Sequence, residues 1–141
     1  MFDSSLTLTG HLSVELNGKV VQEIPNLVVT TGKGYVASRI KDATATAMSH
    51  MAVGTGNTAA AAGDTALGTE AARVALTSTT VSTNTVTYVA TFPAGTGTAS
   101  LTEAGILNGS SGGTLLCRTV YGTVAKGSSD VMSITWVITA S

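Results

Sequence analysis

The stretch Leu6–Gly18, LTLTGHLSVELNG, indicates the fold class of this chain. Its large apolar residues recur at every second position except Gly10, and polar residues lie between them. A period of two places alternate side chains on one face of an extended strand, so the pattern predicts a half-buried β-strand. Asn17-Gly18 follows, and both residues tolerate the positive φ of a tight turn. The stretch therefore predicts a β-hairpin with residues 19–24 as its return strand.

The register of this hairpin is expected to contain an irregularity. A two-residue turn pairs Val14 with Val21, but it also sets the charged Lys19 opposite Leu16. A β-bulge or a longer loop resolves that mismatch. Pro25 cannot donate a hydrogen bond to a neighbouring strand, so we expect the return strand to end there or to lie at a sheet edge.

One short helix is expected after this hairpin. Residues 27–31 are β-branched and extended in character, and Thr31 is a candidate N-cap for a helix that continues to Lys41. The alanine-rich residues 58–63 predict a loop, because Gly63-Asp64-Thr65 follows at once. Asp64 is then expected to cap a single turn, with Leu67 as its apolar anchor.

The remaining chain alternates strand patterns with glycine-rich turns. The expected strands are 48–53, 81–92, 101–107, 115–124 and 131–139, together with further strand character from residue 73 onward. About eight strands at regular spacing predict an all-β, single-domain β-sandwich, jelly-roll-like, with one short helix. The domain is expected to span residues 1–141, with residues 1–5 as a flexible N-terminal arm.

The composition points to a subunit of an assembly. Asp, Glu, Lys and Arg make up only 11% of the 141 residues, and the mean hydropathy is +0.35. An ordinary soluble domain carries about 25% charged residues, so a surface this poor in charge suits a protein largely covered by other protein. The net charge of −1 and the scattered single cations exclude a basic nucleic-acid footprint.

Compartment signals are few. No apolar run approaches the ~18 residues of a transmembrane helix, and the N-terminus lacks a signal-peptide pattern, so no membrane partner is expected. Cys117 is the single cysteine, which excludes an intrachain disulfide and a zinc site built on a cysteine pair. One thiol fits synthesis in a reducing cytoplasm.

The sequence predicts no enzyme, cofactor or metal site. His11 and His50 have no partner at metal-ligand or general-base spacing. Gly54-x-Gly56 lacks the third glycine and lysine of a phosphate loop, and it fits a tight turn that lets two backbones approach. Cys117 precedes Arg118, which would favour a thiolate, but a small buried hydrophobe is the favoured interpretation.

Two charge pairs are candidates for a structural role. Glu103 and Arg118 fall on adjacent expected strands around one hairpin, so a cross-strand ion pair between them is feasible. Two separate solvent-exposed charges are the alternative. Glu70 and Arg73 form a second candidate pair, and either pair is expected to stabilise the fold or a subunit contact.

Three stretches together resemble small structural proteins of tailed-bacteriophage particles. The first is Asn26–Gly32 before the short helix. The second is Met51–Gly56 with Asp64–Glu70 and Arg73, and the third is Thr102–Leu107 with Leu116–Arg118 and Ile134–Thr139. The resemblance covers most of residues 26–139. It is closest to the capsid cement, or head decoration, proteins, and it extends to tail, collar and fibre-attachment proteins, in which a similar module begins a longer chain.

The cement resemblance implies a homodimer or small homo-oligomer on the capsid surface of a virion, made in the host cytoplasm, with the major capsid protein as its partner. Residues 1–5 and 108–113 are candidate contact arms, and exposed strand edges are candidates for β-augmentation. The alternative is a tail, collar or fibre-attachment part. A carbohydrate-binding sandwich is a third class, and it needs exposed aromatic side chains, whereas Trp136 falls on the alternating core face.

Overall fold

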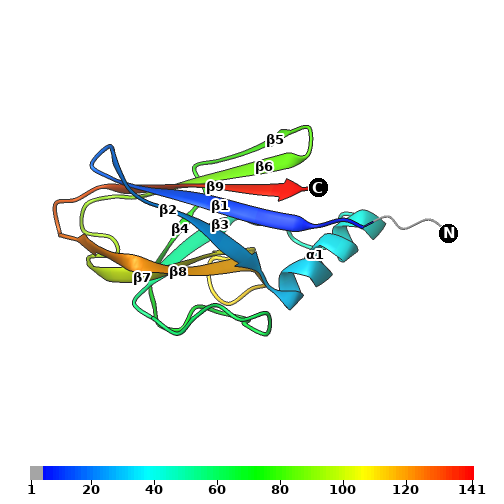
Figure 1. The fold of residues 1–141 in the computed structure, drawn as a ribbon, viewed down its shortest axis with the longest axis horizontal. Coiled ribbons are helices and arrows are strands. Elements are labelled where there is room, and N and C mark those ends of the chain that lie inside the picture. Colours follow the sequence, from blue (N-terminus) through cyan, green and yellow to red (C-terminus); the bar gives the residue numbers. More distant parts are fainter. Residues whose placement is uncertain (1–4) are drawn as a thin grey trace.

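Nine antiparallel strands form one continuous sheet in residues 5–141, the part of the chain that the computed structural model describes (Figure 1). The strands are β1 (Leu8–Leu16), β2 (Lys19–Val28), β3 (His50–Gly54), β4 (Glu70–Ala75), β5 (Ser78–Ser82), β6 (Thr85–Phe92), β7 (Ala99–Leu107), β8 (Leu115–Lys126) and β9 (Met132–Ala140). Their order in the sheet is β4-β3-β7-β8-β2-β1-β9-β6-β5. The expected all-β class with a single short helix is confirmed.

Strand β2 connects the two halves of the sheet. Residues 19–26 of β2 pair with β1, whereas Leu27 and Val28 pair with Arg118 and Cys117 of β8. The sheet curls at this strand, so that β1, β9, β6 and β5 form one layer and β8, β7, β3 and β4 form the other (Figure 1). The curl lets a single sheet enclose its own apolar face.

The core lies between the two layers. Strand β9 supplies Met132, Ile134, Trp136 and Ile138 at alternate positions, all buried, as their spacing predicts. Other large side chains of the same buried cluster come from both layers: Leu12, Phe92, Met51, Leu101 and Ile106. A period of two on each strand is sufficient to build this core.

The first hairpin follows its prediction closely. Asn17 and Gly18 form the turn with φ of 52° and 81°, and Leu16 pairs with Lys19. The expected irregularity is a β-bulge, because the register moves from Glu15↔Val20 to Val14↔Gln22. Val21 is the extra residue, and it stays 40% exposed.

The prediction that β2 ends at Pro25 is wrong, because the strand continues to Val28. Pro25 pairs with His11 of β1, and pairing with β8 begins only at Leu27. The alternative, a return strand at a sheet edge, is also wrong, because β2 lies between β8 and β1. Pro25 is tolerated there because it has a paired strand on one side alone.

The helix α1 (Thr30–Lys41) lies at one end of the sheet (Figure 1). The prediction that Thr31 caps it is wrong, because Val29 is the N-cap residue and makes no side-chain cap bond. The Thr30 amide instead donates to the Ala62 carbonyl at 2.8 Å. The Thr31 hydroxyl donates to the Leu115 carbonyl at 2.9 Å, which fixes the start of the helix on β8.

Gly32 allows this close contact between helix and strand, and its replacement by alanine is expected to destabilise the fold. A Cβ at Gly32 would lie 2.0 Å from the Leu116 carbonyl oxygen, so the helix would have to move. We expect Gly32→Ala to lower the free energy of unfolding by about 1–3 kcal/mol. Gly34→Ala is the matched control, since a Cβ there meets nothing within 4 Å and alanine favours a helix. Urea unfolding of both variants tests this, and equal stabilities would contradict it.

The prediction of one strand over residues 81–92 is also wrong. The segment contains the turn Thr83-Asn84 between β5 and β6, and β5 begins at Ser78. Thr83 has a φ of 52°, which a β-branched residue rarely adopts. No glycine marks this turn, so the sequence pattern runs through it without interruption.

Candidate functional site

Glu103 and Arg118 lie in direct contact on the outer face of the β7–β8 hairpin. The Arg118 Nε donates to Glu103 Oε1 at 3.0 Å, and Arg118 Nη2 lies 2.9 Å from the same oxygen. Both side chains are buried, with 3% of Arg118 and none of Glu103 exposed. The two charges are therefore partners, and the alternative of two solvent-exposed groups is wrong.

Backbone amides complete the surroundings of the Glu103 carboxylate. The amides of Gly56 and Thr69 donate to Oε2, and the amide of Gly68 donates to Oε1, each at 2.7 Å. All three belong to the segment 55–69, which covers this face of the hairpin. A buried carboxylate is tolerated only when its lone pairs are occupied in this way.

Arg118 extends the same network to the far side of the segment. Its Nη1 donates to Asp64 Oδ2 at 2.9 Å, and its Nη2 donates to the Thr58 carbonyl at 3.0 Å. The expected role of Asp64 as a cap of the next turn is not seen, because Asp64 Oδ2 accepts from the preceding Ala61 amide as well. Leu67 is buried against the outer face of the sheet, as expected.

Glycines make room for the carboxylate, as the tight-turn interpretation of Gly54-x-Gly56 predicts. A Cβ at Gly56 would lie 2.5 Å from Glu103 Oε2, and one at Gly54 would lie 2.2 Å from the Thr69 carbonyl oxygen. The Gly56 amide binds a carboxylate of this chain. The Gly54-x-Gly56 turn thus serves close packing of the segment on the sheet.

The network is saturated, which restricts what it can do chemically. Burial raises the pKa of Glu103, but the three amides and Arg118 outweigh burial and hold this pKa below its usual value of 4.5. The carboxylate therefore stays ionised and fully hydrogen-bonded. A proton acceptor or nucleophile needs an unoccupied lone pair that faces a substrate, and Glu103 has none. The role of Glu103 is therefore to hold the segment 55–69 on the sheet.

Acid is expected to weaken the fold through Glu103. Since the folded-state pKa lies below the usual 4.5, the stabilisation is complete above that pH and is lost as the pH falls through the folded-state pKa. Urea unfolding from about pH 7 to about pH 3 is expected to show a steeper loss for the wild type than for Glu103→Gln. Parallel curves would show that Glu103 does not contribute to acid unfolding.

The second charge pair lies at the β4 edge. Arg73 donates to both carboxylate oxygens of Glu70, at 2.9 and 2.7 Å. Its Nη1 also donates to the carbonyls of Gly109 and Gly112, at 2.9 and 2.8 Å. Arg73 thereby attaches the loop 108–113 to β4. This loop is a candidate contact arm, and the structure gives it an anchored base with an exposed tip at residues 110–113.

The candidate arm at residues 1–5 lies outside the described residues except for Ser5, which is exposed.

Residues 109–113 match the letters of a G-x-S-x-G motif, which sequence analysis passed over. That motif needs a strand-to-helix turn to present its serine, and these residues instead join strands β7 and β8.

The histidines and the cysteine are not brought together into a site. His11 is exposed on β1, and His50 on β3 has its Nδ1 2.7 Å from the Ser49 hydroxyl. Within residues 5–141 no three His, Cys, Asp or Glu side chains are placed to hold a metal ion. Cys117 is fully buried, and burial raises the pKa of its thiol, so the interpretation as an activated thiolate is wrong.

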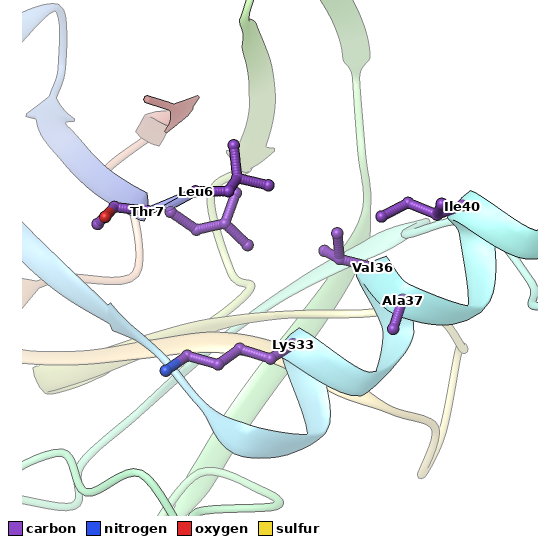
Figure 2. Close-up of a pocket in the computed structure, with 7 residues that line it drawn as sticks. Leu6, Thr7, Lys33, Val36, Ala37 and Ile40 are labelled. Carbon is purple, nitrogen blue, oxygen red and sulfur yellow. The ribbon is translucent and has the colours of Figure 1, made fainter. Parts of the chain in front are cut away.

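An apolar groove separates α1 from the ends of β1, β6 and β9. It consists of two adjoining cavities of about 390 and 340 Å³ that share Leu8, Val36 and Ile40. Figure 2 shows Leu6 opposite Val36 and Ile40, with Lys33 along the edge. Lys33 and Arg39 are the charged residues in its lining. We call this feature the α1 groove, and sequence analysis did not predict it.

Comparisons with protein-family models, curated proteins and solved structures give no match for this chain. Among the described residues, no helix has the length and apolar character needed to cross a membrane.

Proposed function

We propose that this chain is a structural protein of a tailed-bacteriophage virion, which binds the outside of the capsid and joins neighbouring major capsid subunits. One observation carries most weight. Seven large apolar side chains of the described residues stay 37–76% exposed: Leu6, Val20, Val21, Leu27, Ile40, Val81 and Val131. Two of them, Leu6 and Ile40, lie together in the α1 groove, and in a chain with 11% charged residues such an apolar patch favours burial against another protein.

The saturated charge network and the sequence resemblance support the same proposal. Glu103 and Arg118 hold the segment 55–69 without leaving a reactive group, which suits a stable building block. The stretches Asn26–Gly32, Met51–Gly56 and Thr102–Leu107 resemble phage virion proteins. The mechanism is mass action, because a protein that binds only the assembled shell stabilises that state.

Aromatic burial argues against the carbohydrate-binding alternative. Trp136 and Phe92 are fully buried, and Tyr88 and Tyr121 are each 7% exposed. Of the aromatic residues that the structure describes, Tyr35 is the single one that is not buried. Stacking on a sugar ring needs an exposed aromatic face.

The α1 groove is the proposed contact with the capsid subunit. Its apolar floor and its two cations, Lys33 and Arg39, complement an apolar chain segment that carries an acidic side chain. Ile40 is 76% exposed at this groove, so Ile40→Asp is expected to preserve the fold and abolish binding to capsids. Thr135→Asp is the matched control, since Thr135 is exposed on β9, is not one of the exposed apolar side chains and does not line the groove.

Gold labelling of intact particles, with the copy number measured by quantitative mass spectrometry, tests the location. Gold over the whole head with hundreds of copies is the expected result for a cement protein. Gold at the neck or tail with few copies would establish the alternative, a tail, collar or fibre-attachment part. Unlabelled particles would contradict both.

A further inference from the structure

The two edges of the sheet differ sharply in how they are protected. Strand β4 carries the Glu70–Arg73 ion pair, has an irregular register beside β3, and is attached to the loop 108–113. Charges and bulges of this kind are the means by which proteins block edge pairing. Strand β5 has none of these devices.

Strand β5, Ser78–Ser82, is exposed at all five positions and has β6 as its paired strand on one side only. The sequence from residue 74 to residue 102 contains no Asp, Glu, Lys or Arg. The β5–β6 register is regular over the whole strand, and β5 contains no proline. An uncharged, regular, exposed edge is a ready template for another strand.

The hydrogen-bond pattern of β6 shows which groups of β5 turn outward. The Ala140 amide donates to the Asn84 carbonyl at 2.9 Å, so Asn84 and the residues two and four positions beyond it direct their backbone groups to β9. The intervening residues of β6 therefore direct theirs to β5, and their partners there are Ser82, Thr80 and Ser78. The amides and carbonyls of Thr79 and Val81 are left facing outward.

We propose that β5 pairs antiparallel with β5 of a second copy of this chain, about a two-fold axis at Thr80. This register sets Thr79 opposite Val81 of the other copy, twice, so the four outward amides and carbonyls of each copy become paired. Thr80 then faces Thr80, and Ser78 faces Ser82. Only small hydroxyl-bearing and β-branched side chains meet, without any charge to repel them.

The inference extends the homodimer or small homo-oligomer that the cement resemblance implies, and its test uses the isolated protein. Sedimentation is expected to give twice the monomer mass for the wild type. Thr80→Lys and Thr80→Glu each place like charges face to face at the axis, so each variant alone is expected to sediment as a monomer. An equimolar mixture of the two is expected to recover the dimer.

Thr135→Lys is the matched control. Thr135 is an exposed threonine on the same outer face of the layer, but it lies on the central strand β9, so this variant is expected to remain dimeric. A monomeric wild type, or dimers that persist in Thr80→Lys and Thr80→Glu, would overturn the proposal. Failure to bind capsids would leave this result unchanged, so the two proposals fail separately.

A cysteine scan tests the register itself. Facing residues of this non-hydrogen-bonded type lie about 4.5 Å apart at Cα, which a disulfide can span. Thr80→Cys is therefore expected to cross-link into dimers under mild oxidation, and the buried Cys117 does not compete. Ser78→Cys is the control, because its partner is Ser82 and its own counterpart lies about 13 Å away. Cross-linking by Ser78→Cys but not Thr80→Cys would overturn the register.

Discussion

A Glu103→Gln substitution is expected to lower the free energy of unfolding by about 3–5 kcal/mol, because it leaves Arg118 as a buried charge without its main partner. The new amide NH2 also faces the donors of Gly56, Gly68 and Thr69, where two donors cannot bond each other. For a chain of this length, such a loss lowers the melting temperature by about 10–17 °C. Urea unfolding and calorimetry measure both quantities.

Glu70→Gln is the matched control for this prediction. It neutralises the carboxylate of the second ion pair, whose side chain is 34% exposed, and partly exposed pairs contribute about 1 kcal/mol or less. Combining Glu103→Gln with Arg118→Met is expected to cost less than the sum of the two single changes, since neither charge is then buried alone. A Glu103→Gln variant as stable as Glu70→Gln would contradict a stabilising role for the network.

Trp136→Ala is expected to cost about 3–5 kcal/mol, because it empties the largest fully buried side chain of the core. Trp136 lies between Leu12 of β1 and Tyr88 of β6, so the lost volume is at the centre of its layer. Equilibrium unfolding in urea is the measurement, with the midpoint expected to fall and the slope to stay unchanged.

Trp136→Phe separates volume from polarity at the same position. The Trp136 Nε1 is buried and has no hydrogen-bond partner among the described residues, and an unsatisfied donor of this kind costs about 1–3 kcal/mol. Phenylalanine removes that donor while keeping most of the ring, so its loss is expected to be clearly smaller than that of Trp136→Ala. Equal losses for the two variants would show that the retained ring volume contributes nothing, which would contradict this expectation.

Local patterns predict the elements of this fold well. The alternation in β1 and β9 and the Asn17-Gly18 turn act within a few residues, where backbone geometry and side-chain direction are directly linked. The missed turn at Thr83-Asn84 has the opposite origin. Its positive φ falls on a threonine, so the local chemistry opposes the turn and the surrounding hairpin imposes it.

The order of the strands lay beyond sequence analysis. Strand β9 pairs with β1 and β6, which are distant in the chain, and β2 pairs with both β1 and β8. These choices depend on which faces the assembled sheet buries, and many orders bury the same residues. A period of two identifies a strand's buried face but not its neighbour.

The candidate site divides in the same way. Glu103 and Arg118 were predicted as candidate partners because they flank one hairpin, and Gly54-x-Gly56 was interpreted as a close approach of two backbones. The three amide donors were missed, because every residue except proline has an amide and the sequence does not show where it points. The sequence signal that was available was the presence of two glycines, Gly56 and Gly68, in one segment that also contains Asp64.

The difference between the two sheet edges limits how many copies of this chain can join by strand pairing. A sheet with two open edges accepts a neighbour at each end and grows into a filament without limit. Here the Glu70–Arg73 pair and the attached loop 108–113 close one end, and the bare strand Ser78–Ser82 leaves the other available. If β5 pairs with a second copy as proposed, growth along the strand-pairing direction is expected to stop at two copies, because the Glu70–Arg73 pair blocks pairing at β4.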